Sequence, residues 1–400
     1  MAYADFIKQN SKLTNFMPPR MWTYMEGCNE LTKVSLSPLW ERNIRKNLKK
    51  LYRKHGSLYQ HFYGFGSNKA LIAVGAGPSF KLNKERLVSL CKWNLPFRLE
   101  DQPFILMATN HQFKALLKEE VIPHFVLLTD GGDSAYDQLC KDIPSFARGT
   151  ILIAPLHGDH KTLKEWSRQG REICFYMGDT DLNKSIFKEI IKKDSAPIAV
   201  PQGGNVMNTA WWMGMKTLGS SVFMAVGNDL SFEYTDDYDS RKKAFYADGD
   251  YSATITDQRN QAKDSFAWMG FRLRQSPLVG IKERVDLSPV GTSRQMFIYK
   301  LWAEMHAIAW SDLAEPFHYY NCSEAGILGI IPKSYESEKF GDINQWTLLD
   351  DIIPNRWHTR TLEKATKEFL RARRSVLHQD APFVTGLAGK VGFAANAALR

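Results

Sequence analysis

Short apolar runs alternate with helix-like stretches from Ala70 onward, and this alternation limits the fold more than any other feature of the sequence. Each run is almost continuously apolar, which is typical of strands buried on both faces of a parallel sheet. We therefore expect an α/β fold with a doubly wound, mostly parallel sheet. The predicted strands are Ala70–Val74, Phe104–Ala108, His124–Leu128, Thr150–Ala154, Ile173–Met177 and Val222–Val226.

Stretches with apolar residues at helical spacing separate these strands. A long amphipathic helix is predicted at Ser293–Trp310, and a strand-like run follows at Phe317–Tyr320. The order of elements predicts a Rossmann-like domain over residues 69–335. A polar, acidic stretch at 233–263 interrupts it, and we interpret this stretch as an excursion or lid. The predicted helices between the strands are Lys84–Trp93, His111–Glu120 and Asn205–Leu218.

Two terminal segments together account for the whole net positive charge. The net charge is +9, and residues 41–54 hold seven Lys or Arg against one Glu, while residues 360–374 hold six against two acids. Both segments look helical, so we predict a basic helical N-terminal extension at 1–68 and another at the C-terminus, 336–400. A solvated helix face is the simpler interpretation of such charge. A platform for a polyanion is the alternative, and we do not expect nucleic acid as the partner.

Other compositional features favour a cytoplasmic enzyme. The five cysteines are scattered and form no CxxC pair, so neither a disulfide framework nor a zinc site is predicted. The first sixteen residues lack a charged start followed by an apolar run, and we expect no secretory signal. No apolar stretch approaches the roughly 20 residues that span a bilayer.

One glycine-rich turn follows the first predicted strand, where open parallel sheets bind their ligands, and a second opens a predicted helix. Glycine lets the backbone approach a phosphate closely, and a helix N-terminus offers unpaired amides. Glycine also suits an ordinary turn, and neither loop matches a dinucleotide fingerprint or a Walker loop. The nucleotide-binding candidates here are Gly75, Gly77, Pro78, Ser79, Gly203, Gly204, Asn205 and Thr209.

Polar side chains follow other strands at the same predicted edge. Asn110 follows the second strand, Asp130 the third, and Asn228 and Asp229 the sixth. Each also suits a helix or turn cap. Because buried polar loops lose stability unless partners satisfy them, such turns gathered at one edge predict a ligand site. Further candidates at this edge, for substrate, are Asn208, Asn321, Ser323 and Glu324.

Taken together, these segments resemble a family that joins the motility accessory factors with the archaeal-type 6-hydroxymethylpterin diphosphokinases. The late glycine–aspartate motif and the first glycine loop are also similar to those of bacterial sialyltransferases that use a cytidylate-activated sugar. The chain departs from the family pattern at Asn208, where histidine is frequent, and at Ala325, where glycine is frequent. The matching segments are Val74–Ser79, Asn110, Pro123–Asp130, Gly203–Val206, Thr209-Ala210, Leu218-Gly219, Gly227–Phe232, Asn321–Gly326 and Gly329.

The resemblance implies a nucleotide-dependent transferase. The leading hypothesis is a glycosyltransferase that uses a nucleotide-activated, nonulosonic- or sialic-acid-like sugar. Pyrophosphoryl transfer from ATP with Mg²⁺ to a 6-hydroxymethylpterin is one alternative, and a non-catalytic nucleotide- or polyanion-binding assembly protein is another. The acceptor stays open between a protein hydroxyl, a glycan and a pterin.

Roles follow from this hypothesis. Ser79 and Asn205 would donate to phosphates, while Asn110 and Asn228 would read base or ribose. Asp229 and Asp130 are candidates for the general base or for Mg²⁺ ligands. Further candidate bases are His306, which also suits a core position, and His318. The acidic side chains Asp236, Asp237 and Asp239 fit a solvated loop better than a metal site.

Overall fold

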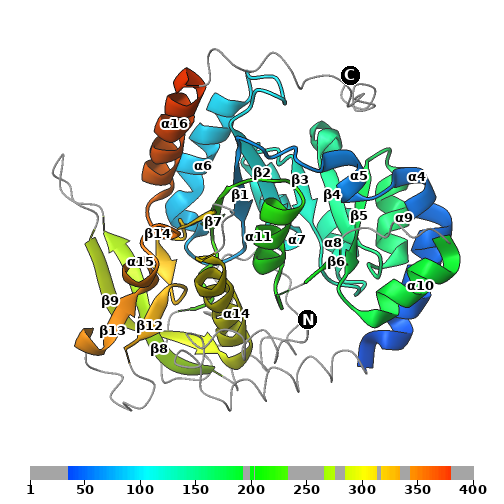
Figure 1. Cartoon of the computed structure of the whole chain (residues 1–400). Coiled ribbons are helices and arrows are strands. Elements are labelled where there is room, and N and C mark those ends of the chain that lie inside the picture. The colour runs from blue at the N-terminus through cyan, green and yellow to red at the C-terminus, as the bar shows by residue number, and fades with distance from the viewer. Residues whose placement is uncertain are drawn as a thin grey trace.

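A nine-stranded parallel sheet forms the centre of the molecule, as the computed structural model shows (Figure 1). The structure describes residues 35–191, 199–201, 203–232, 265–274, 284–312, 317–333 and 343–379. The predicted lid at 233–263, with Asp236, Asp237 and Asp239, lies outside the described residues, as does the end of the C-terminal segment.

The main sheet confirms the predicted fold class. Its strands lie in the order β14-β10-β7-β1-β2-β3-β4-β5-β6, and every pairing is parallel. All six predicted strands form, and their central residues are buried on both faces, as continuous apolar runs require. The strands are β1 (Ala70–Val74), β2 (Phe104–Thr109), β3 (Phe125–Leu127), β4 (Ile151–Pro155), β5 (Ile173–Gly178), β6 (Ala199–Val200), β7 (Val222–Val226), β10 (His318–Asn321) and β14 (Trp357–Thr359).

Helices cover both faces of this sheet. Alternate residues of β1 divide between the two: Leu71 packs with the helices α11 and α14, and Ile72 packs with α6 and α16. A doubly wound layer follows, with α6 and α16 side by side (Figure 1). The helices are α5 (Leu58–Phe62), α6 (Phe80–Asn94), α7 (Asn110–Lys118), α8 (Ala135–Leu139), α9 (His160–Arg168), α10 (Asp181–Ile191), α11 (Val206–Lys216), α14 (Arg294–Trp310), α15 (Leu349–Ile352) and α16 (Leu362–Gln379), with short 3-10 turns η2 (Ser145–Gly149) and η3 (Ile343–Gln345).

The strand order reverses between β1 and β7. From β1 the chain adds β2 to β6 on one side, and it then returns to place β7, β10 and β14 on the other. In open α/β sheets, ligands bind outside the carboxyl ends of the strands at such a switch point. The loops after β1 and β7 therefore stand at the position that the fold favours for a site.

The basic N-terminal segment is helical and packs into the core. Residues 35–47 are α-helical and continue through a π-helical turn, η1 (Leu48–Tyr52), into α4 (Arg53–His55). Leu48 is fully buried, while the Nδ2 of Asn47 donates to the carbonyl oxygens of Leu156 and Gly158, both at 2.8 Å. This helix thus secures the loop after β4, and its basic side chains lie on the outer face.

Helix α14 differs from the prediction, because it is not amphipathic. Between Phe297 and Ile308 nearly every side chain is buried. The cause is a second, three-stranded sheet that packs on the side of α14 away from the main sheet, as Figure 1 shows. A helix covered from both sides needs no polar face. This sheet has the order β11-β8-β9, with β8 (Ser265–Arg274), β9 (Arg284–Ser293) and β11 (Ala325–Gly326).

The segment after residue 336 also adds strands that the sequence did not predict. β14 pairs with β10 at the edge of the main sheet, and β12 (Ile330–Pro332) pairs with β13 (Trp346–Leu348). These strands have three residues each, too few for a periodic pattern. The basic stretch at 360–374 does form a helix, α16, as expected.

Candidate functional site

The glycine loop after β1 lies directly against the loop after β7. Gly75 N donates to Val226 O at 2.8 Å, and Gly77 N donates to Gly227 O at 2.9 Å. A Cβ on Gly75 would lie 2.5 Å from Gly227 O, so only glycine allows this approach. The two loops at the switch point thus use backbone amides to bind each other, and those amides are not free for a phosphate.

Asp229 occupies the N-terminus of α6. Its Oδ2 accepts from Ser79 N at 2.6 Å, and its Oδ1 accepts from the Ser79 hydroxyl in a short hydrogen bond. The side chain is buried. A carboxylate here satisfies an orphan amide and interacts favourably with the helix dipole. Ser79 therefore binds a carboxylate of its own chain, in the place where we expected it to bind phosphate.

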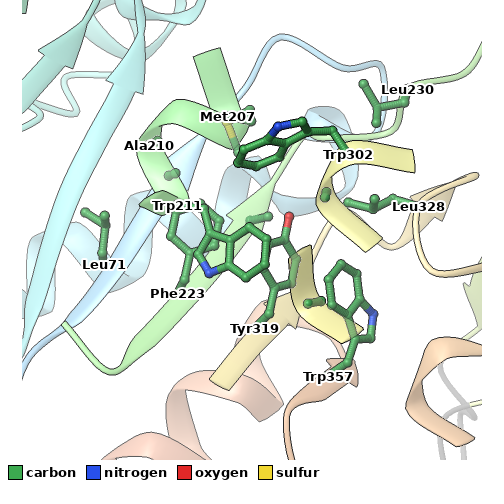
Figure 2. Packing of buried hydrophobic residues seen from close by; sticks show 14 of the residues in the cluster. Leu71, Met207, Ala210, Trp211, Phe223, Leu230, Trp302, Tyr319, Leu328 and Trp357 are labelled. Atoms are coloured by element: carbon green, nitrogen blue, oxygen red, sulfur yellow. The ribbon is translucent and has the colours of Figure 1, made fainter. Parts of the chain in front are cut away.

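Asn228 belongs to a buried network with the loop after β10. Its backbone N–H donates to Ser323 Oγ at 2.9 Å, and its side-chain Nδ2 donates to the Tyr319 hydroxyl at 3.3 Å. Figure 2 shows Tyr319 between Trp211 and Trp357; its ring stacks on Trp357 at 4.1 Å between centroids. Burial raises the pKa of Tyr319 well above its usual range, so its hydroxyl stays neutral. Asn228 is held by protein groups on two sides.

The other residues that the sequence assigned to substrate also bind within the protein. Asn321 accepts from Ser323 N at 3.2 Å and donates to Leu328 O at 2.9 Å, which shapes the loop between them. Glu324 is paired with Arg86 of α6 in a short ion pair. Nearby, Asn83 Nδ2 donates to Cys322 O at 2.9 Å, while the buried Asn83 Oδ1 has no hydrogen-bond partner among the described residues.

The second glycine loop caps α11 and packs on α14. Asn205 Oδ1 accepts from Asn208 N at 2.7 Å, and the Thr209 hydroxyl donates to Asn205 O at 3.0 Å. Asn208 Nδ2 donates to Gly203 O and to Tyr299 O. Gly204 is exposed, and a Cβ there would meet the Tyr299 ring at 2.5 Å. This loop keeps an open backbone at the first turn of an eleven-residue helix.

The end of β2 holds two buried polar atoms that have no hydrogen-bond partner within the part of the chain that the structure describes. They are Thr109 Oγ1 and Asn110 Oδ1, on residues 6% and 4% exposed. The other amide atom of Asn110, Nδ2, donates to Gln138 Oε1 at 2.6 Å. Since buried polar groups are nearly always satisfied, this pair indicates a missing water or ligand. Thr109 was not a sequence candidate, because a threonine at a strand end is unremarkable.

Asp130 and Asp229 do not meet. Asp130 follows β3, and strands β1 and β2 lie between it and the end of β7. Three strand spacings amount to about 14 Å, too far for one metal ion to bridge. Asp130 is exposed, and its Oδ1 accepts from Gly132 N at 3.0 Å. Among the described residues no group of three or more His, Cys, Asp or Glu is arranged for a metal ion. The two aspartates therefore do not lie close enough to hold one Mg²⁺ ion together.

His306 is a buried core residue, which is a poor position for a general base that must contact substrate. Its ring stacks on Trp302 at 3.8 Å between centroids, and its Nδ1 lies 2.7 Å from Trp302 O, so Nδ1 carries a proton and donates it. Burial lowers its pKa to about 4. The catalytic role proposed for His306 is not supported by this position. His318 lies 3.2 Å from His358 in a β10–β14 pair, and burial lowers its pKa.

A fully buried ion pair was missed from the sequence. Lys300 Nζ donates to both carboxylate oxygens of Glu304, at 2.7 and 2.5 Å, and both side chains are buried. Burial lowers the pKa of Lys300 and raises that of Glu304, because it disfavours charge on each. The signal was present: beyond Arg294, which begins the helix, these are the charged residues of α14, and they are four positions apart.

Substitution of Gly77 by alanine is expected to destabilise the protein by about 1 to 3 kcal/mol even without nucleotide. The new Cβ would lie 2.7 Å from Gly227 O and 2.8 Å from the Asp229 carboxyl carbon. Urea denaturation measures the change. Gly132→Ala is the control, because its Cβ would make only ordinary contacts at 3.5 Å with Asp130. Equal stability of the two variants would contradict the close approach of the two loops.

Residues 42–235 match the family model described as 6-hydroxymethylpterin diphosphokinase MptE-like. This part of the chain is therefore similar to the MptE-like family. The match covers the glycine loops, β1 to β7 and Asp229, so the family resemblance seen in the sequence is confirmed there.

The structure of MAf glycosyltransferase from Magnetospirillum magneticum AMB-1 is similar, with a TM-score of 0.46 and 13% sequence identity. The alignment covers 85% of this chain and 42% of that chain, so this chain spans less than half the length of that protein. No protein of curated function matches the sequence significantly. No helix of the described residues has the length and apolar character needed to cross a membrane.

Proposed function

We propose that the protein is a nucleotide-dependent transferase, and that it moves a glycosyl group from a nucleotide-activated sugar to an acceptor hydroxyl. The observation that carries this proposal is the pair of unsatisfied, buried atoms Thr109 Oγ1 and Asn110 Oδ1. They lie at the carboxyl end of β2, next to the switch-point strand β1. A nucleotide's base or ribose supplies hydrogen-bonding groups that would satisfy both atoms.

The proposed phosphate site is the second glycine loop. The first turn of α11 lies beside the loop after β1, since a Cβ on Gly75 would be 3.3 Å from Met207. The exposed backbone at Gly204 and the helix N-terminus therefore face the same edge as Asn110. This assignment replaces the first glycine loop, whose amides are engaged with β7.

Asp130 is the better candidate for the general base. Its carboxylate is exposed at the end of the strand next to β2, whereas both oxygens of Asp229 accept from Ser79. In glycosyl transfer a base takes the proton of the acceptor hydroxyl as the new bond forms. Asp130 alone would also suit a Mg²⁺ ion that arrives with nucleotide phosphates, because such ions need only one or two protein carboxylates.

A second candidate function is pyrophosphoryl transfer from ATP. The match of residues 42–235 to a diphosphokinase-like family favours it. In this reaction Mg²⁺ supplies charge stabilisation on the transferred phosphates, and the same edge of the sheet would hold the nucleotide.

A thermal-shift panel of CMP, CDP, UDP, GTP and ATP, with and without Mg²⁺, tests the proposal. A nucleotide at 100 times its dissociation constant should stabilise the protein by about 2.7 kcal/mol. Stabilisation by cytidine or uridine nucleotides supports glycosyl transfer, and stabilisation by ATP only with Mg²⁺ supports the diphosphokinase. If no nucleotide stabilises the protein, the proposal is wrong. If a nucleotide binds but no group is transferred to any acceptor, the protein is a nucleotide-binding protein and not a transferase.

Asn110→Ala should weaken nucleotide binding at least about tenfold, because one hydrogen bond to a polar ligand group is lost. Asn94→Ala is the matched control. Asn94 is also buried, and its Oδ1 also has no partner among the described residues, but it lies at the C-terminus of α6, at the opposite edge of the sheet. Equal effects of both variants on affinity would argue against the assigned edge.

A further inference from the structure

The Lys300–Glu304 pair is also hydrogen-bonded to a residue outside its own helix. Besides accepting from Lys300, Glu304 Oε1 accepts from Gly329 N at 2.6 Å. Gly329 has a φ of +89° and its Cα lies against the Trp357 indole, where a Cβ would be 2.9 Å from Nε1. The buried carboxylate therefore fixes the backbone of the loop that joins β11 to β12.

This loop in turn holds the backbone of Asp229. Ile327 N donates to Asp229 O at 3.0 Å, and a Cβ on Gly326 would overlap the Asp229 backbone. Leu230, the next residue, has a φ of +53°, a strained conformation for leucine that needs support from its surroundings. A chain of contacts thus runs from Glu304 through residues 326–329 to Asp229, and on to Ser79.

The same helix also holds the second glycine loop. Five residues before Glu304, the Tyr299 carbonyl accepts from Asn208 Nδ2 at 3.0 Å, and the Tyr299 ring packs on Gly204. In Figure 2, the ring of Trp302 from α14 lies near Met207 at the start of α11, and Leu328 of the 326–329 loop lies on the other side of Trp302. α14 is therefore the element that fixes both loops relative to each other.

Stability alone does not explain a charged pair at this position. Taking two charges out of water costs free energy that their attraction only partly offsets, and apolar residues of similar volume are frequently as stable or more so. Lys300 Nζ lies 5.8 Å from the centroid of the Phe297 ring, and the apolar residues of α14 around the pair belong to the buried core. What an apolar side chain would not supply is an acceptor for Gly329 N.

We propose that Lys300 and Glu304 are positioning residues, which hold the 326–329 loop, and with it Asp229, in register with the nucleotide-binding loop at Gly203–Asn205. This inference rests on the proposed function for its effect on nucleotide binding. The effect on the loop itself does not depend on any ligand.

Two double variants test the proposal. Lys300→Met/Glu304→Leu removes the charges and the acceptor, while Lys300→Met/Glu304→Gln removes the charges but keeps an acceptor for Gly329 N. Amide hydrogen exchange of residues 326–329 measures the loop, and thermal shift with CMP, and with ATP and Mg²⁺, measures binding. The exposed pair Glu363 and Lys367 on α16, also four residues apart, gives the control variant Glu363→Gln/Lys367→Met.

In the Met/Leu variant we expect a folded protein in which exchange of the loop amides rises at least about tenfold and nucleotide affinity falls at least about tenfold, since the loop loses its anchor. In the Met/Gln variant and in the α16 control, the loop exchange rate and the nucleotide affinity should both equal those of the wild type. If the pair served only global stability, the Met/Leu variant would be less stable overall, and its loop exchange and nucleotide affinity would change only as much as that loss of stability explains.

The outcomes are separable. Met/Leu with wild-type loop exchange overturns the proposal, whatever happens to binding. If Met/Leu does not fold, Met/Gln decides: slow loop exchange supports the proposal, and fast exchange overturns it. If wild-type protein binds no nucleotide, the proposed function fails, while the exchange result still decides whether the pair positions the loop.

Discussion

Asp229→Ala should lower the free energy of unfolding by about 3 kcal/mol, because two buried donors lose their acceptor. Both are groups of Ser79, its amide and its hydroxyl, at the N-terminus of the fifteen-residue helix α6. Urea denaturation should give a lower midpoint with an unchanged slope. A loss below about 0.5 kcal/mol would contradict this capping role.

Asp229→Asn separates the capping role from a catalytic one. Asparagine keeps one oxygen acceptor and caps helices nearly as well as aspartate, so we expect a stability loss of about 1 kcal/mol. If nucleotide-dependent transfer then falls by a factor on the order of 10² to 10⁴, the charge of Asp229 serves the reaction as well. If transfer stays within a few-fold of wild type while Asp130→Asn abolishes it, Asp130 is the base.

The second large effect that we expect is a loss of stability at acid pH, because several histidines are buried as neutral rings. Burial lowers the pKa of His157 and of His306 to about 4, against about 6.5 for an exposed ring. Between these pH values the unfolded chain binds more protons than the folded chain, so stability falls as the pH is lowered from about 6.5 to about 4. Each of the two rings contributes on the order of 3 kcal/mol to this loss.

Urea denaturation at several pH values measures this dependence. His306→Phe is the matched variant, because phenylalanine keeps an aromatic ring on Trp302 but does not titrate. Its stability should depend on pH less steeply by about 1.4 kcal/mol per pH unit within the window, the value for one proton. Stability that stays constant from neutral pH to about pH 5 would show that these rings are not neutral in the fold.

The helices and strands of the main sheet could be predicted because their cause is local. Val222–Val226 is a run of apolar residues with no polar position, and such a run finds burial on both faces only inside a parallel sheet. The edge at which the polar turns gather followed from the same reasoning, since parallel strands end on one side. Asn110, Asn205 and Asn228 do lie there.

The partners of those polar side chains could not be predicted, because they come from distant parts of the chain. Ser79 binds Asp229, 150 residues away, and Asn228 binds Ser323 and Tyr319. A glycine loop that binds phosphate and one that binds a neighbouring loop have the same sequence pattern. Only the tertiary contacts separate them, and here they move the proposed phosphate site from the first glycine loop to the second.

The sequence by itself determined the fold class, the edge of the sheet at which the polar turns gather and the family resemblance, because these depend on apolar periodicity and on motifs read along the chain. The tertiary structure decided which polar groups are already satisfied. It placed His306 among tryptophans, separated Asp130 from Asp229 by two strands, and buried Lys300 with Glu304 by covering α14 with a second sheet. Burial and pairing are properties of the packed molecule, and a residue's chemistry in a site depends on both.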